Sequence, residues 1–158
     1  MADYELVIRA RRVVTPDGIR PATVAVRDGR IAALAAFGDA PGAVRVEELP
    51  GPEVLLPGVV DTHVHVNEPG RTEWEGFASA TRAAAEGGVT TLIDMPLNCL
   101  PPTTSTGPLR RKQPTARGGW VDVGFWGGAV PGNLGELAGL HRAGVFGFKA
   151  FLVDLEKV

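Results

Sequence analysis

The stretch that decides the fold runs PGVVDTHVHVNEPGR, from Pro57 to Arg71. Its first part is apolar, and Asp61, His63 and His65 then stand at alternating positions. Because alternate residues of a strand point to one face, a strand that continues to His65 would project both imidazoles to the same side, with the Asp61 carboxylate as a further candidate. Two converging imidazoles can bind a borderline-soft metal such as zinc. The alternative is a polar strand end with two incidental histidines.

Composition argues against several classes of partner. The 158 residues include 16 basic and 18 acidic side chains, so the net charge of −2 gives no electrostatic reason to expect a nucleic acid or an anionic membrane. The single cysteine, Cys99, cannot form an internal disulfide, the N-terminus lacks the pattern of a signal peptide, and no apolar run approaches the length of a membrane span. We therefore expect a cytoplasmic protein with no nucleic-acid or membrane partner.

The first 53 residues predict a small β-sandwich subdomain. Short strands are expected at residues 4–14, 22–27, 30–36 and 44–49. The segments between them contain turn residues: TPDG at 15–18 has proline second and glycine last, and DG at 28–29 is a strong signal for a two-residue hairpin. No side chains in these strands suggest chemistry.

From residue 54 onward the pattern changes to strands that alternate with helices. The expected strands are 54–65, 89–95, 120–125 and 145–152, and the expected helices are 73–85, capped by Thr72, and 133–143. This alternation predicts right-handed βαβ units and a parallel sheet. Pro108 and Pro114 interrupt the segment that should cross from the second strand to the third, so a short or broken helix is expected there.

Polar residues follow the ends of these strands, which is the face of a parallel barrel that carries catalytic groups. The two histidines end the first strand, Asn98 follows the second, and Lys149 lies on the fourth. Lys149 is flanked by aromatic and aliphatic residues, where a bare ammonium is costly to bury. It either snorkels to the sheet edge, pairs with Asp154 or Glu156, or reacts in its neutral form with carbon dioxide to give a carbamate that bridges two metal ions.

Several longer motifs accompany these residues. HVH at 63–65 is joined by AAEGGVTT at 84–91 and GFK at 147–149. Together they resemble the metal-dependent cyclic amidohydrolases, a superfamily that includes dihydroorotases, hydantoinases and allantoinases. Three further motifs, NEPGRTEWEGF at 67–77, DMPLN at 94–98 and GFWGG at 124–128, are similar to those of allantoinases. The resemblance extends over nearly the whole chain, as far as residue 152.

The resemblance implies an α/β fold: a urease-like (β/α)8 TIM barrel preceded by the small β-sandwich. Residues 1–53 would belong to the sandwich, and residues 54–158 would supply the first four barrel strands. The resemblance also implies a centre of two zinc ions, or of another divalent metal, in which His63 and His65 hold one ion and carbamylated Lys149 bridges both. Asn98 is implied as a substrate contact. The expected reaction is hydrolysis of the hydantoin ring of allantoin to allantoate, by a homo-oligomer that is a tetramer in the family.

Two features leave alternatives open. Dihydroorotases carry an arginine two positions after the histidine pair, where this chain has Asn67, so a dihydroorotase-like activity is disfavoured and a hydantoinase- or dihydropyrimidinase-like activity stays open. A full barrel needs about 250 residues, so the barrel is expected to be incomplete, and His141, inside an expected helix, is not counted as a ligand. We therefore expect a truncated chain that is inactive alone. The alternatives are a non-catalytic remnant and one half of a split enzyme that pairs with another chain.

Overall fold

The computed structural model describes residues 2–39 and 41–152. The chain divides into two compact units, Met1–Pro57 and Gly58–Val158. None of the helices within the described residues is long and apolar enough to cross a membrane.

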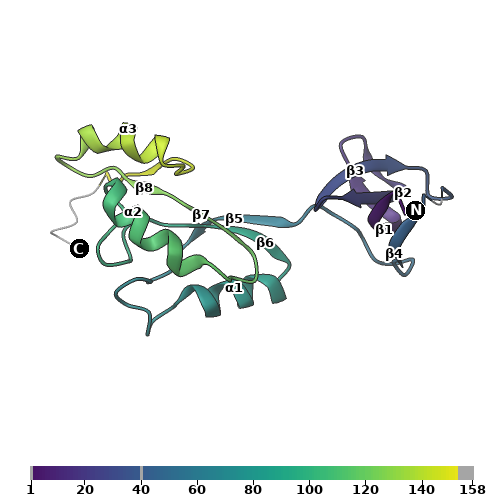
Figure 1. Ribbon diagram of the computed structural model, residues 1–158, viewed down its shortest axis with the longest axis horizontal. Helices are drawn as coiled ribbons and strands as arrows, with labels where there is room; N and C mark the ends of the chain where they lie inside the picture. The colour runs from purple at the N-terminus through teal and green to yellow at the C-terminus, as the bar shows by residue number, and fades with distance from the viewer. Residues whose placement is uncertain (1, 40, 153–158) are drawn as a thin grey trace. The chain divides into compact units, whose positions relative to one another are not determined.

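The first unit is built on one four-stranded sheet. Its strands are β1 (Tyr4–Thr15), β2 (Gly18–Arg27), β3 (Arg30–Ala35) and β4 (Ala43–Glu48), in the order β3-β2-β1-β4. The first three form an antiparallel meander and β4 pairs in parallel with β1, so the four strands expected from the sequence are confirmed (Figure 1). Asp28 and Gly29 both have positive φ, 53° and 67°, as a type I′ hairpin turn requires of its two central residues.

The second unit contains a series of parallel strands. β5 (Val59–Val64), β6 (Val89–Asp94) and β7 (Asp122–Phe125) form one sheet in that order, and β8 (Gly127–Gly128) pairs with β9 (Phe148–Lys149). The single residue Trp126 separates β7 from β8, and the backbone N–H of Phe146 donates to the carbonyl oxygen of Phe125 at 3.0 Å. The fourth stretch of strand therefore continues the parallel series beside the third, as predicted, although only two of the residues expected at 145–152 are strand.

The helices of this unit differ from expectation mainly at the start of α1 (Phe77–Glu86). The helix begins four residues later than predicted and Thr72 is not its cap; the N-cap position is Gly76, and the Glu68 carboxylate accepts the backbone N–H of Phe77 at 2.9 Å. The preceding residues fold into a loop in which Trp74 is 71% exposed. An acidic residue from outside the helix thus satisfies one of the free N–H groups of its first turn.

The segment that carries two prolines forms α2 (Thr106–Lys112), followed at once by the 3₁₀ turn η1 (Gln113–Ala116). The predicted short, broken helix is confirmed. Pro108 lies in the first turn of α2 and Pro114 in the first turn of η1, positions where a missing N–H costs no hydrogen bond within the helix. The interruption leaves Lys112 as the last residue of α2.

One apolar core joins all three helices to the sheet. It contains Phe77 from α1, Leu109 from α2 and Leu140 from α3 (Leu134–Arg142), together with Val66 and Phe125 at the ends of strands. The rings of Phe77 and Phe125 meet edge to face, with centroids 6.1 Å apart. Val66 is fully buried and directly follows His65, so the core extends to the residue beside a predicted metal ligand.

Candidate metal site

The end of β5 does not follow the simple alternation that the sequence predicts. Between Asp61 and Val64 the strand advances three residues, while its partner β6 advances two, from Leu92 to Asp94. This is a bulge, and it changes which face the following side chains meet. The Asp61 carboxylate accepts the backbone N–H of His63 at 3.0 Å.

Asp61 consequently does not join His63 in one cavity. It lines a cavity beside α1, with Val64, His65 and alanines of the helix, whereas His63 lines a different one. The two imidazoles themselves lie close together, with ring centroids 5.2 Å apart and an angle of 47° between the ring planes. Both histidines are exposed. The structure thus brings the two rings together, while Asp61 shares a cavity with His65 and not with His63.

His65 is oriented by Asn98 from the loop that follows β6. Its Nδ1 lies 2.7 Å from the Asn98 amide oxygen. Since an amide oxygen can only accept, Nδ1 is the nitrogen that donates, and in the neutral ring this leaves the lone pair on Nε2. A histidine that ligates a metal usually has its second nitrogen fixed in this way. This contact was not foreseen from the sequence, because it depends on the path of the loop from Met95 to Asn98.

Lys149 lies in β9 and lines the same cavity as His63, together with Thr62, Met95, Trp126 and Phe148. It is half-buried, and its Nζ lies 5.1 Å from the ring centroid of Phe151. The indole N–H of Trp126 donates to the carbonyl oxygen of Thr62 at 2.8 Å, which ties the end of β5 to the strands that carry Lys149. The alternative partners of this lysine, Asp154 and Glu156, lie outside the described residues.

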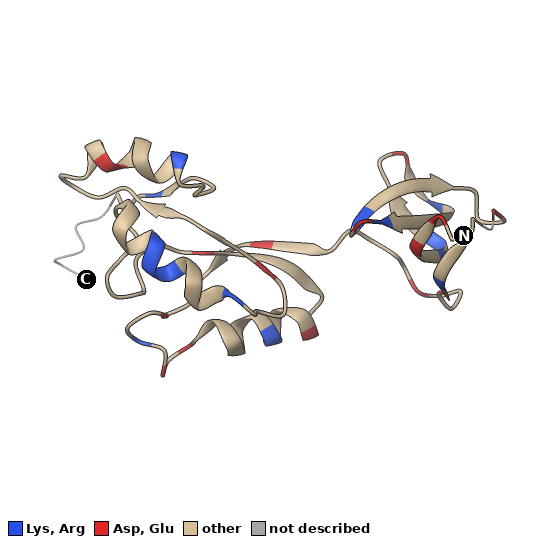
Figure 2. Ribbon diagram, in the orientation of Figure 1, with Lys and Arg blue, Asp and Glu red and all other residues tan. Residues whose placement is uncertain are grey.

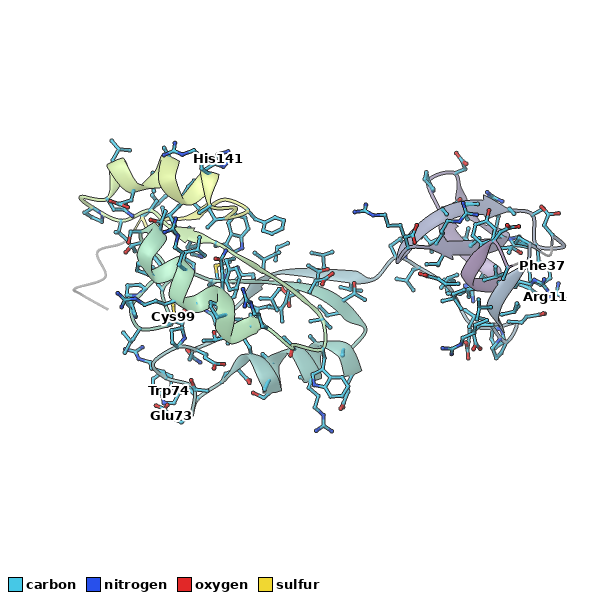
Figure 3. All side chains as sticks on the ribbon, viewed as in Figure 1. Arg11, Phe37, Glu73, Trp74, Cys99 and His141 are labelled. Carbon is cyan, nitrogen blue, oxygen red and sulfur yellow. The ribbon has the colours of Figure 1, made fainter. Side chains whose placement is uncertain are left out.

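The third histidine lies elsewhere. Figure 3 shows His141 on α3, where it is exposed in the last turn of the helix. Within residues 2–39 and 41–152, no group of three or more His, Cys, Asp or Glu side chains has an arrangement that could hold a metal ion. The described residues therefore offer two imidazoles and one lysine at this end of the strands.

Sequence reasoning missed a buried ion pair directly behind the site. Asp94, at the end of β6, and Lys112, at the end of α2, are 0% and 1% exposed, and the Lys112 ammonium contacts the Asp94 carboxylate. The same ammonium donates to the carbonyl oxygen of Met95 at 3.1 Å and lies 5.9 Å from the ring centroid of Phe125. The other Asp94 oxygen accepts the backbone N–H of Val66 at 2.7 Å.

Burial raises the pKa of the Asp94 carboxyl above its ordinary value of 3.8, and the attraction of the Lys112 ammonium and the bond from Val66 oppose that rise. One signal in the sequence could have identified Lys112. In a helix that ends before Pro114, residues three apart share a face, so Lys112 lies on the face of buried Leu109. Its neighbours Arg110 and Arg111, which share the blue band of α2 in Figure 2, are exposed.

The sequence of the chain is similar to a known protein family and to several curated proteins. The sequence model of the Amidohydrolase family matches residues 54–139. An allantoinase of Streptomyces avermitilis is 62% identical over 154 residues, which are 96% of this chain and 34% of the relative. A mitochondrial allantoinase of Aquarana catesbeiana is 47% identical over 151 residues, 94% of this chain and 31% of the relative. The chain spans about a third of the length of these curated relatives.

A solved structure supports the same assignment. The L-hydantoinase (dihydropyrimidinase) from Arthrobacter aurescens superposes with a TM-score of 0.87 at 35% sequence identity, over 96% of this chain and 34% of the hydantoinase. The predicted α/β fold, with the first strands of a urease-like TIM barrel, is confirmed by this likeness. The chain belongs to the amidohydrolase family.

Proposed function

We propose that residues 58–152 contribute part of the metal centre of an allantoinase, which hydrolyses the cyclic amide of allantoin to allantoate. Water supplies the hydroxyl to the carbonyl carbon, the ring C–N bond breaks, and the leaving nitrogen takes a proton. The observation that carries the proposal is that His63 and Lys149, from the first and the last described strands of the series, line one cavity. Similarity to two allantoinases over nearly the whole chain supports the choice of substrate.

The residues present fit the metal that the family implies. His63 and His65 would hold one ion through ring nitrogens, and the proton on Nδ1 of His65 leaves its Nε2 free to bind. Lys149 would be carbamylated: its neutral amine would add to carbon dioxide and lose one proton. The carbamate would supply oxygen ligands to two ions, zinc by resemblance. A divalent metal bound here would activate water and polarise the amide carbonyl.

The chain's own residues would fix the geometry of this centre. The Trp126 bond to the Thr62 carbonyl ties the end of β5 to the residue between β7 and β8, and β8 pairs with the strand of Lys149. Asn98 remains our proposed substrate contact. Because its Oδ1 is used by His65, the contact with a substrate carbonyl would come from its amide nitrogen, which donates.

A hydantoinase or dihydropyrimidinase activity is the second candidate, and the likeness to the Arthrobacter aurescens enzyme favours it. Both candidates share ring-opening chemistry, so the metal ligands do not separate them. A dihydroorotase-like activity is less well supported, because Asn67 is 8% exposed and carries no charge to hold a substrate carboxylate. We also propose a cytoplasmic homo-oligomer, with the tetramer implied by resemblance; light scattering on the purified protein tests the assembly.

A chimaera tests the function directly. Residues 1–152 would replace the matching first third of the Streptomyces avermitilis relative, and hydrolysis of allantoin, hydantoin and dihydroorotate would be measured with bound zinc. We expect allantoin to be hydrolysed fastest, with activity lost in His63→Ala and Lys149→Ala and retained in His141→Gln. Faster hydrolysis of hydantoin would favour the second candidate. Full activity in both alanine variants would refute the proposed ligands.

A further inference from the structure

The Lys112 ammonium has no place in the proposed reaction, yet it is among the largest fully buried side chains of the molecule. A buried ammonium is retained only where its partners offset the loss of water. Its partners here are the carboxylate of Asp94, the carbonyl oxygen of Met95 and the face of the Phe125 ring. Two of these three belong to consecutive residues at the end of β6, beside the histidine strand.

Asp94 is connected to the segment of His65, and Met95 to the segment of Asn98, which are the two partners of the His65–Asn98 hydrogen bond. Asp94 accepts the backbone N–H of Val66, the residue that follows His65. Met95 begins the short loop that ends at Asn98. One ammonium therefore anchors both segments, the one that carries the imidazole and the one that carries the amide.

We propose that Lys112 is a positioning residue for the metal site: through Asp94 and Met95 it holds the segments of His65 and Asn98 in register, so that the imidazole keeps its proton on Nδ1 and presents Nε2. The proposal rests on the proposed function to the extent that His65 is a ligand. The orientation of the ring itself, however, can be measured without any metal. Lys112 touches neither substrate nor metal in this role.

The first measurement is the NMR spectrum of the imidazole nitrogens in the metal-free chain. The chain has three histidines, and His141, which is exposed on α3, serves as an internal reference. Signals are assigned with His63→Ala and His141→Gln. In the parent we expect His65 with its proton fixed on Nδ1. In Lys112→Met we expect its nitrogen shifts to move toward those of His141, which stay unchanged.

The second measurement is zinc affinity by titration calorimetry. Loss of a residue that orients a metal-ligating histidine typically weakens metal binding by ~10–100-fold, and we expect a decrease in that range for Lys112→Met. Arg111→Met removes an exposed cation from the same helix and should leave both readouts unchanged. Leu109→Ala removes a buried apolar side chain from the same helix face, so it lowers stability without touching Asp94 or Met95.

A double variant separates positioning from folding. In Asp94→Asn with Lys112→Met, the amide oxygen can still accept the Val66 N–H and no buried charge is left without a partner, so the chain should fold. The Met95 carbonyl still lacks its donor, so the His65 shifts should stay displaced toward those of His141. This variant also serves if Lys112→Met alone does not fold. Displaced His65 shifts in a folded double variant support the proposal, and full recovery of the parent shifts overturns it, because the ring is then held without the Lys112 ammonium.

The remaining outcomes distinguish the two proposals. Unchanged His65 shifts in folded Lys112→Met overturn the positioning role, and so does an equal change in Leu109→Ala, because either result makes Lys112 only a stabilising residue. A parent chain that binds no zinc while Lys112→Met still releases the His65 ring contradicts the proposed metal ligands and supports the positioning role.

Discussion

Replacing Lys112 by methionine should be one of the most destabilising single changes available in the second unit. The variant keeps most of the side-chain length and removes the charge, which leaves the fully buried Asp94 carboxylate without its cation and the Met95 carbonyl without its donor. Breaking a buried ion pair by removing one partner costs about 3–5 kcal/mol. Because the free energy of unfolding of a domain of this size is only ~5–15 kcal/mol, the change would remove a large part of it.

The partner change breaks the same ion pair from the other side. Asp94→Asn leaves the buried Lys112 ammonium without its counter-ion, although the amide oxygen keeps an acceptor for the Val66 N–H. We therefore expect Asp94→Asn also to cost about 3–5 kcal/mol. The double variant, which removes both charges, should recover most of either loss, a coupling of at least ~3 kcal/mol.

Urea denaturation followed by tryptophan fluorescence measures these quantities. All three tryptophans, Trp74, Trp120 and Trp126, lie in the second unit, so the signal reports that unit and not the N-terminal sheet. The matched control is Arg111→Met, which should change stability by less than ~0.5 kcal/mol. A loss below about 1.5 kcal/mol in Lys112→Met, or a double variant no more stable than Lys112→Met, would refute the reasoning.

Three further predictions concern the same unit. Phe77→Ala should lower the free energy of unfolding by about 3–5 kcal/mol, because it empties the centre of the core and removes the edge-to-face contact with Phe125; Phe77→Leu, compared in the same urea series, should cost clearly less. Glu68→Ala should cost ~1 kcal/mol by uncovering the N–H of Phe77, and circular dichroism should show less helix, while Glu73→Ala in the same loop serves as the control. Because the pKa of Asp94 is raised in the folded state, the stability that its bound proton contributes is complete below pH 3.8 and is lost as the pH rises through the folded pKa. The free energy of unfolding of the parent, relative to that of Asp94→Asn, should therefore fall as the pH rises from 3.8 through the folded pKa. A rise over the same pH range would contradict the assigned direction.

Local signals in the sequence predict the strands and helices well where turn chemistry fixes them. The Asp28-Gly29 pair adopts the positive φ values that its hairpin needs, and the prolines at 108 and 114 begin helical turns where a break was expected. The start of α1 could not be read in the same way. Trp74 fits the helical spacing, but Glu68 accepts the first N–H of the helix at Phe77, and that contact from outside the helix fixes where it begins.

The site shows where pattern reasoning ends. Alternation places Asp61, His63 and His65 on one face, but the register against β6 inserts an extra residue between Asp61 and Val64, and a register depends on the partner strand. The sequence does not single out Lys112, because it follows two arginines and a run of basic residues normally marks a solvated face. Its burial depends on where α2 ends and on the acid placed opposite it, and neither is local. The roles of His63, His65, Asn98 and Lys149 stay predictions.

A metal site needs ligands held to within a fraction of an ångström, and the exposed histidines of this chain cannot supply that precision by themselves. His63 lies in β5 and His65 directly follows its last residue, and among the described residues β5 pairs with β6 alone in its sheet. Order therefore has to come from contacts one residue away: Val66 in the apolar core, its N–H on Asp94, and the Thr62 carbonyl on Trp126. Of these, only the Asp94 contact depends on a buried charge pair, so it is the one that a single substitution in another helix can remove. That dependence is why Lys112, rather than a residue of the histidine strand, is the most informative position to change.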